Sequence, residues 1–122
     1  MKVPSFLLKR LYVKGSLRNT NNGFEFRLKN GLGSGYAYGL PPLKVDDEEL
    51  AAEETSFSVD GKSLKFPEVS KDNPASLSMN REAIITVNGR KLNPGPHKGT
   101  MAFTVAGLGE LRFDLVDNLN ED

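Results

Sequence analysis

Residues 57–66 read Phe-Ser-Val-Asp-Gly-Lys-Ser-Leu-Lys-Phe, and they contain the strongest turn signal in the chain. The central pair Asp60-Gly61 favours a two-residue turn, because both residue types tolerate the positive φ angles that such turns require. A turn at this pair places Phe57 opposite Leu64, and the apolar side chains of both strands then share one face. These side chains are Phe57, Val59, Leu64 and Phe66. The stretch predicts an antiparallel hairpin with one buried face.

A second hairpin is predicted near the start of the chain. Apolar and polar residues alternate over residues 11–18 and again over residues 24–29, as the two-residue period of a strand requires. Residues 20–23 read Thr-Asn-Asn-Gly, which are types that adopt turn conformations readily. The residues assigned to the core face are Leu11, Val13, Gly15 and Leu17 in the first run and Phe24, Phe26 and Leu28 in the second.

The C-terminal half contains turn signals of the same kind. Residues 84–87 are rich in β-formers, and the following Asn88-Gly89 predicts a hairpin that brings Ile85 opposite Leu92. A stiff turn is expected at Pro94-Gly95-Pro96. Beyond it, the alternating runs 101–105 and 111–115 predict a last hairpin that turns at residues 107–109.

The segments between these hairpins predict an edge strand, a short ambiguous stretch and a long connection. Pro41-Pro42 place the run 40–45 at a sheet edge, because proline cannot donate to a ladder. Residues 48–54 fit either one helical turn or an acidic loop. Residues 67–82 are polar and contain two prolines, so they predict a connection that can cross from one sheet to another.

Roughly eight strands with one apolar face each predict an all-β fold, a two-layer antiparallel β-sandwich, since every apolar face needs a second face to cover it. The architecture is immunoglobulin-like without a disulfide, because the chain has no cysteine and no tryptophan. A small oligonucleotide-binding-type barrel is the alternative. The side chains expected between the layers include Phe26, Phe57, Ile85, Phe103 and Phe113.

Length and composition indicate one globular domain over residues 1–122. Residues 1–10 form its N-terminal segment, in which we expect one or two helical turns whose Phe6, Leu7 and Leu11 cap an open end of the sandwich. Residues 118–122 are expected to be a frayed acidic tail. No apolar run approaches the roughly 18 residues of a membrane span, and Lys9-Arg10 interrupt the only candidate for a secretory signal. We therefore expect a cytoplasmic protein.

Charge is balanced overall but alternates along the chain. Sixteen basic and sixteen acidic side chains cancel, yet residues 1–33 contain seven Lys and Arg against the single acid Glu25. Residues 34–60 reverse this balance, with seven acids against Lys44. Alternating blocks of this kind can be neutralised within a fold or against a second copy of the chain, whereas a uniformly basic chain would indicate nucleic acid.

The search for catalytic and metal-binding patterns predicts no catalytic residue, no metal site and no cofactor. His97 is the only histidine and is treated as a loop site, since no Gly-x-Ser-x-Gly elbow offers it a serine. The acidic residues 46–49 lack the ligand spacing and central glycine of a calcium loop. The glycine-rich residues 31–35 lack the third glycine of a dinucleotide fingerprint, because Tyr36 stands at that position.

The outward face of the first hairpin is the candidate anion or partner surface. It carries Lys14, Arg18, Arg27 and Lys29 around one acid, Glu25. We do not expect nucleic acid there, because Phe24 and Phe26 alternate onto the opposite face and cannot stack on bases. An acidic protein surface fits better, including residues 46–54 of the same or a neighbouring chain.

Two functions are therefore kept open. The first is a non-enzymatic interaction or accessory module that docks a protein partner, or a second copy of itself, through its charged faces. The second is a carrier that holds an anionic or acyl small molecule between the sheets or beneath the loop of residues 31–35.

Two stretches carry a resemblance to known sequences. They are Leu8-Lys9-Arg10-Leu11-Tyr12-Val13-Lys14-Gly15-Ser16-Leu17, continuing through Asn19-Thr20 to Gly23-Phe24-Glu25-Phe26, and Leu92-Asn93-Pro94-Gly95-Pro96-His97 with Gly107-Leu108-Gly109-Glu110-Leu111. The chain resembles small uncharacterised prokaryotic proteins, some of which carry a hydroxymethylglutaryl-CoA reductase label that we interpret as transferred between sequences. A reductase of that kind is a longer enzyme with a nucleotide-binding fold and a catalytic histidine, acid and lysine. None of those motifs can be placed here, so no residue role is carried over.

Overall fold

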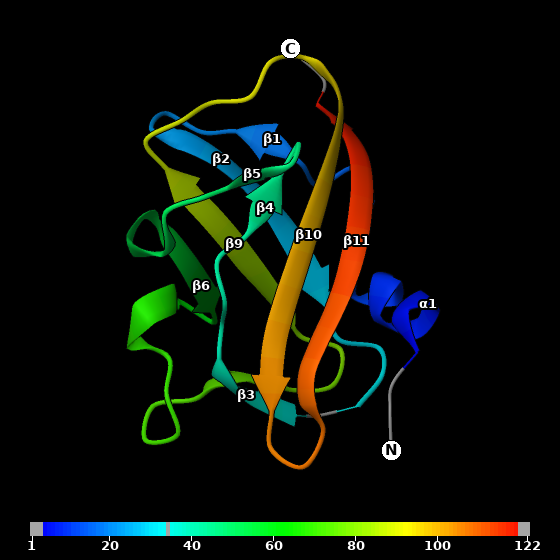
Figure 1. Ribbon diagram of the computed structural model, residues 1–122, viewed down its shortest axis with the longest axis vertical. Coiled ribbons are helices and arrows are strands. Elements are labelled where there is room, and N and C mark those ends of the chain that lie inside the picture. The colour runs from blue at the N-terminus through cyan, green and yellow to red at the C-terminus, as the bar shows by residue number, and fades with distance from the viewer. Residues whose placement is uncertain (1–3, 34, 120–122) are drawn as a thin grey trace.

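The strands of the protein form two antiparallel sheets that lie face to face, with β10 and β11 in front of β2, β9 and β6 in Figure 1. The structure is a computed structural model that describes residues 4–33 and 35–119. The predicted all-β sandwich is therefore confirmed, and the two sheets do not close into the barrel that was its alternative.

The first sheet has the strand order β1-β2-β9-β6-β7. Its strands are β1 (Arg18–Asn19), β2 (Gly23–Lys29), β6 (Thr55–Val59), β7 (Lys62–Lys65) and β9 (Glu82–Asn88). The Asp60-Gly61 turn joins β6 to β7 with Phe57 opposite Leu64 and Val59 opposite Lys62, as predicted. Both turn residues have positive φ angles, which explains why an Asp-Gly pair occurs there.

The second sheet is built around β10, the strand that contacts three others. Its strands are β3 (Gly35–Gly39), β4 (Lys44–Val45), β5 (Glu48–Glu49), β8 (Ala75–Leu77), β10 (Gly95–Val105) and β11 (Gly109–Leu119). One edge of β10 pairs along its whole length with β11. Its other edge is shared, because β4 pairs with Gly99 and Thr100 whereas β3 pairs with Thr104 and Val105.

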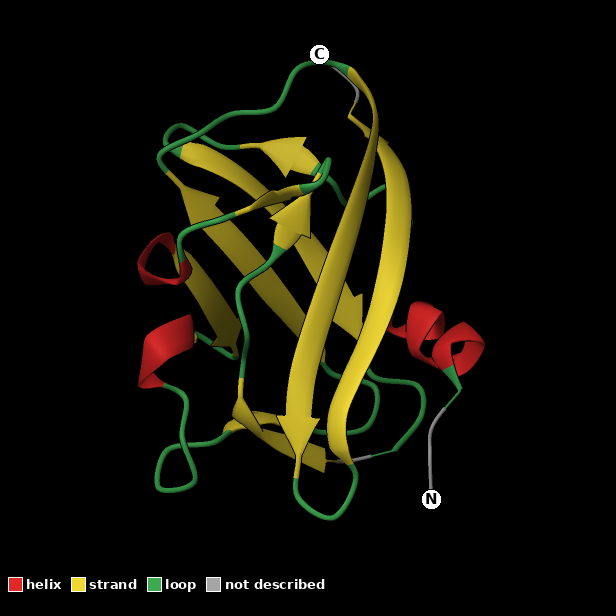
Figure 2. Ribbon diagram, viewed as in Figure 1, coloured by secondary structure: helices red, strands yellow, loops and turns green. Residues whose placement is uncertain are grey.

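Short helical segments lie at the margins of the sheets, as Figure 2 shows. They are α1 (Ser5–Leu8) with the 3-10 turn η1 (Lys9–Leu11), and the 3-10 turns η2 (Ala52–Glu54) and η3 (Phe66–Glu68). Helical turns at the N-terminus were predicted, with Phe6, Leu7 and Leu11 capping the core. Leu11 is buried and Leu7 is half-buried, but Phe6 is 68% exposed and Leu8 is buried instead.

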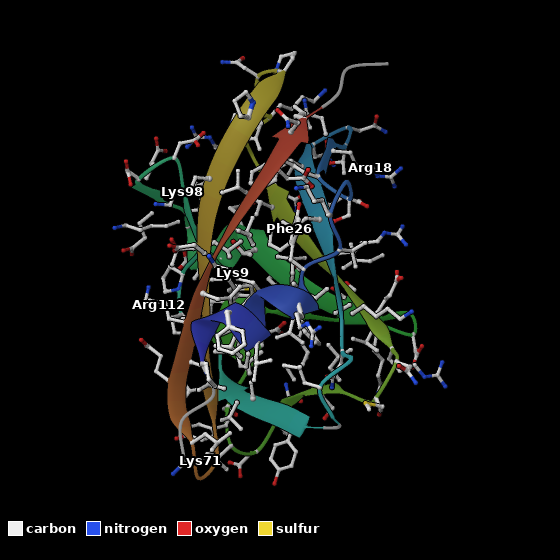
Figure 3. All side chains as sticks on the ribbon, turned by 90° about the vertical axis from the view of Figure 1, so that its right-hand side faces the viewer. Lys9, Arg18, Phe26, Lys71, Lys98 and Arg112 are labelled. Atoms are coloured by element: carbon white, nitrogen blue, oxygen red, sulfur yellow. The ribbon has the colours of Figure 1, made fainter. Side chains whose placement is uncertain are left out.

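The core lies between the two sheets and follows the two-residue period of the strands. Phe26, Phe57, Ile85 and Phe113 are buried, and Phe103 is partly buried against them. Figure 3 shows Phe26 between the layers, whereas Arg18 and Lys98 point outward from opposite sheets. Burial of these apolar faces is the main favourable contribution to folding.

The hairpin predicted at Asn88-Gly89 is wrong. Gly89 does have a positive φ, but Leu92 does not pair with Ile85. Both edges of β9 are already occupied, by β2 on one side and by β6 on the other. Leu92 is instead held by Asn19, whose side chain bonds both the N–H and the carbonyl of Leu92.

Strand lengths also differ from the predictions. The alternating run 11–18 yields only the two-residue β1, because the chain leaves the extended conformation in a turn at Gly15, where φ is 86°. The expected turn at residues 94–96 is the start of β10. Asn118 and Leu119, which were expected to belong to the frayed acidic tail, pair with β10 instead. The remaining tail residues, 120–122, lie outside the described residues.

Residues 67–82 cross between the sheets as predicted, and they contribute a strand that was not predicted. They leave the first sheet after β7, supply β8 to the second sheet beside β3, and return to the first sheet at β9. The other ambiguous stretch, residues 48–54, divides into the short strand β5 and the turn η2.

One polar interaction connects the two sheets through their core. The hydroxyl of Tyr12 donates to Asp117 Oδ2 at 2.5 Å, and the N–H of Gly15 donates to the same oxygen at 2.8 Å. Tyr12 itself pairs with Leu28 of β2, whereas Asp117 belongs to β11 and is only 5% exposed. Burial raises the pKa of the Asp117 carboxyl, but the hydrogen bonds it accepts outweigh burial and hold its pKa below the ordinary value.

Replacing the tyrosine tests this interaction. Tyr12→Phe removes one hydrogen bond to a buried carboxylate, and we expect it to lower the free energy of unfolding by about 1.5–3 kcal/mol. Because the folded pKa of Asp117 is depressed, its stabilising contribution is present above the unfolded pKa of about 3.9 and is lost as the pH falls through the folded pKa. Urea unfolding at neutral and acidic pH measures both effects. A variant as stable as the parent at neutral pH would contradict the role assigned to Tyr12.

Candidate functional site: an apolar cavity between the sheets

A cavity of about 390 Å³ opens between the two sheets at the end where α1 and β3 lie. The first sheet contributes Leu28 and Phe57 to its wall, and the second contributes Met101, Phe103 and Leu111, among others. Its volume falls within the range of roughly 300–1,000 Å³ that is typical of small-molecule sites. The cavity is therefore large enough for a ligand and not only for a water molecule.

The N-terminal segment forms one side of this cavity. Leu7 and Leu8 of α1 and Leu11 of η1 all line it. The mouth is formed by the chain before and within β3, where Leu32 is 40% exposed and Tyr36 is 55% exposed although both also line the cavity. An apolar interior thus continues into exposed apolar side chains at its opening.

The cavity lining, as far as the structure describes it, carries no charged side chain. Its main polar group is Asn30, which is 6% exposed. The side-chain amide of Asn30 donates to the carbonyls of Gly33 and Leu77, and its oxygen accepts from the N–H groups of Leu32 and Gly33. Because an unpaired charge is costly to bury, the cavity fits an uncharged, apolar group.

The glycine-rich loop before β3 has a structural explanation. The N–H groups of Leu32 and Gly33 are bonded to Asn30, so they are not directed at a phosphate. Gly33 has a φ of 142°, a conformation that glycine adopts more readily than other residues. These contacts make residues 31–33 part of the connection between β2 and β3, and the cavity lies beside this loop.

His97 lies on β10 rather than in a loop, and both of its ring nitrogens contact acceptors. Nδ1 lies 2.6 Å from Asp46 Oδ2, and Nε2 lies 2.6 Å from the carbonyl oxygen of Asn93. Because a carbonyl cannot donate and Asp46 is ionised at neutral pH, both nitrogens must donate, which requires the imidazolium form. Lys98 adds a backbone N–H to the other oxygen of Asp46 at 3.1 Å.

The charges around His97 favour the same protonation state. Burial and the nearby Arg90 guanidinium lower the pKa of His97. The hydrogen bonds with Asn93 and Asp46 and the negative charge of Asp46 raise it, and their combined effect is larger, so the pKa of His97 is raised. The hydrogen bond from His97 in turn holds the pKa of Asp46 below its ordinary value. The pair joins the β4–β5 turn to the start of β10, which is a structural role.

Substituting His97 should therefore produce a pH-dependent loss of stability. Since the folded pKa of His97 is raised, its contribution is complete below the unfolded pKa of about 6.5 and is lost as the pH rises through the folded pKa. Since the pKa of Asp46 is lowered, its contribution is lost as the pH falls below about 4. We expect the destabilisation caused by His97→Gln to be largest at about pH 4–6.5 and to diminish towards pH 9. Urea unfolding over this range checks the prediction, which a pH-independent difference would contradict.

The predicted basic surface is only partly free. Arg18 bonds Glu25 at 3.1 Å across β1 and β2, and Arg27 contacts Glu82 of β9 at 3.4 Å. Lys14 and Lys29 are exposed, and neither has an ion pair within the described part of the chain. The structure therefore places the four residues on or beside β2 but engages two of them internally.

Of the acidic residues 46–49, Asp46 and Asp47 form a two-residue turn between β4 and β5, and Glu48 and Glu49 are β5. Asp46 and Asp47 have φ angles of 52° and 67°, which a two-residue turn of this type requires. Glu48 is bonded to Arg90, and Asp46 to His97. Over residues 4–33 and 35–119, no group of three or more His, Cys, Asp or Glu side chains could hold a metal ion.

Sequence reasoning named the space between the sheets or beneath residues 31–35 as a possible ligand position, but it did not identify the residues that line the cavity. Its lining comes from α1, η1, both sheets and three loops, and most of these residues are also ordinary core positions. One signal was available, because Leu7, Leu8 and Leu11 are spaced as one helical face beside an open end of the sandwich. That pattern indicates a packed segment but not the space beneath it.

The fold and the cavity together define the class of the protein, a two-layer β-sandwich with an apolar cavity between its sheets. A family model described as hydroxymethylglutaryl-CoA reductase, N-terminal domain, matches residues 7–120, and the chain belongs to this family. No curated protein matches the sequence. The resemblance is thus confirmed at the level of the family label. Among the described residues, no helix is long and apolar enough to cross a bilayer.

Proposed function

We propose that the protein is a non-enzymatic binding module that holds the apolar part of an acyl ligand in the cavity between its sheets. The observation that supports this most is the cavity of about 390 Å³ with a continuous apolar lining and an open mouth. Removing apolar surface from water is favourable by roughly 25 cal/mol per Å², so such a lining favours an apolar ligand over water. We expect the module to act in the cytoplasm.

The chemistry of the cavity limits the acyl group that it fits. The family name mentions hydroxymethylglutaryl-CoA, whose acyl group carries a carboxylate. No cation lines the cavity within the described residues, and burying an unpaired carboxylate is costly. An unbranched hydrocarbon chain is therefore a better occupant, with its polar head group left in water at the mouth.

Filling the cavity tests the proposal. Ala37 of β3 and Ala75 of β8 are buried, line the cavity and lie opposite each other. We expect Ala37→Phe to weaken binding of dodecanoate at least tenfold, measured by isothermal titration calorimetry, because its ring occupies the space of the acyl chain. The parent protein should show a negative heat-capacity change on binding and no binding of hydroxymethylglutaryl-CoA.

Two further variants make this test decisive. Ala51→Phe adds the same ring at an exposed position before η2, outside the cavity, and should bind dodecanoate like the parent. Ala75→Leu is the smaller alternative if Ala37→Phe fails to fold. Dodecanoate binding that survives in both folded cavity variants, or that is absent from the parent, would refute the proposed site.

A second candidate function is docking through the charged faces, to a protein partner or a second copy of the chain. The observation that favours it is the set of charges without ion pairs in the described ranges. Among these charges are Asp47, Glu49, Glu53 and Glu54 on the acidic side and Lys14 and Lys29 on the basic side. Complementary patches of this kind steer association and weaken as salt screens them.

Self-association through these patches should depend on salt. We expect a dimer at low ionic strength and a monomer in about 0.5 M NaCl, measured by size-exclusion chromatography with light scattering. Lys29→Glu should leave a monomer at both salt concentrations, because it repels the acidic patch. A parent protein that is monomeric under both conditions would exclude docking to a second copy.

A further inference from the structure

Exposed apolar and basic side chains lie on α1 and η1, whose leucines line the cavity, and exposed apolar side chains lie on the chain at its mouth. Phe6 is 68% exposed on α1, the helix whose Leu7 and Leu8 line the cavity. Leu32 and Tyr36 are exposed at the mouth itself. Single exposed apolar residues are ordinary, but a group of them beside an apolar cavity is typical of an interaction site.

Two cations follow the last residue of α1 directly in the chain. Lys9 and Arg10 lie in η1, both are exposed, and neither has an ion pair in the described part of the molecule. In Figure 3, α1 and Lys9 face the viewer on the same side of the molecule as Arg112 of β11. This combination of residues favours a surface that is apolar and negatively charged at once.

The acids of β11, the strand on which α1 packs, do not neutralise these cations. Glu110 is paired with Arg112 at 3.0 Å. Asp117 is buried in its bonds to Tyr12 and Gly15. Asp114 accepts a hydrogen bond from Thr100 on the neighbouring strand β10. Within the described residues, therefore, no acidic side chain is bonded to Lys9 or Arg10.

We propose that this side, defined by Phe6, Lys9, Arg10, Leu32 and Tyr36, docks on an anionic lipid bilayer. Phenylalanine and tyrosine side chains enter the interface between head groups and acyl chains, and lysine and arginine extend to anionic head groups. The docked orientation turns the cavity mouth towards the acyl chains. The proposal rests on the proposed acyl binding for its purpose, but adsorption to the lipid can be measured separately.

Vesicle sedimentation tests the docking. The parent protein should bind vesicles of equal parts phosphatidylglycerol and phosphatidylcholine at least tenfold more tightly than vesicles of phosphatidylcholine alone. The variant Lys9→Gln/Arg10→Gln should lose about thirtyfold in affinity for the anionic vesicles, since each cation near such a surface contributes about 1 kcal/mol, or about fivefold. Phe6→Ser should lose at least fivefold and should fold normally, because Phe6 is exposed.

Matched controls distinguish this surface from a general attraction. Val116→Ser removes an apolar side chain that is 60% exposed on β11, and Lys62→Gln/Lys91→Gln removes two exposed cations elsewhere. Both should bind anionic vesicles within twofold of the parent. The proposal would be overturned if the controls lost as much affinity as the surface variants, or if the parent bound neutral vesicles as tightly as anionic ones. It would also be overturned if the parent bound no vesicles, and this last result would favour a protein partner instead.

The same variants separate this proposal from the proposed function. Phe6→Ser and Lys9→Gln/Arg10→Gln should bind dodecanoate in vesicle-free buffer with the parent's affinity within threefold, because neither alters the lining of the cavity. Vesicle binding without dodecanoate binding would support the docking surface and refute the cavity function. Dodecanoate binding without vesicle binding would do the reverse.

Discussion

The arrangement of the N-terminal segment depends on the hydrogen bonds that the carboxylate of Asp117 accepts. This carboxylate is buried on β11 of the second sheet, yet its donors Tyr12 and Gly15 belong to the segment that pairs with the first sheet. A buried carboxylate is stable only when its acceptor positions are filled, so a shift of the N-terminal segment that left Asp117 buried without these donors would be destabilising. Fixing Tyr12 also fixes η1 and α1, and these form one wall of the cavity.

The fold was predictable wherever local chemistry decides the outcome. The Asp60-Gly61 hairpin has the expected register, because turn residues and the two-residue period agree there, and the C-terminal hairpin turns at residues 106–108, one residue before the predicted turn. The failure at Asn88-Gly89 has a non-local cause. The turn chemistry is present, but β2 and β6 occupy both edges of β9, and no local pattern reveals which strands will compete for an edge. The early end of the first run has a similar origin, since the turn at Gly15 is stabilised by distant Asp117.

The candidate site was less predictable than the fold, because its parts are ordinary residues in an unusual arrangement. A leucine that lines the cavity and a leucine that fills the core look the same in a sequence; Leu111 and Leu43 are both buried, but only Leu111 lines the cavity. The role of His97 was equally hidden. Its partners Asp46 and Asn93 are placed by the β4–β5 turn and by the irregular segment before β10, neither of which the period of the strands predicts.

Two features accompany the open cavity. Hydrogen bonds hold its mouth, and the strands that form its walls differ in length. Asn30 uses both side-chain atoms to hold the loop of residues 31–33 and β8, so collapse of the mouth would leave buried amide groups without partners. One edge of β10 pairs with β4 and β3 in separate places, and residues 101–103 between those places pair only with β11. A cavity held open by satisfied polar groups is preformed, and a preformed apolar site loses less entropy on binding than one that a ligand must open. The hydrogen bonds of Asn30 that pair the backbone groups at the mouth therefore also keep the space between the sheets available to a ligand.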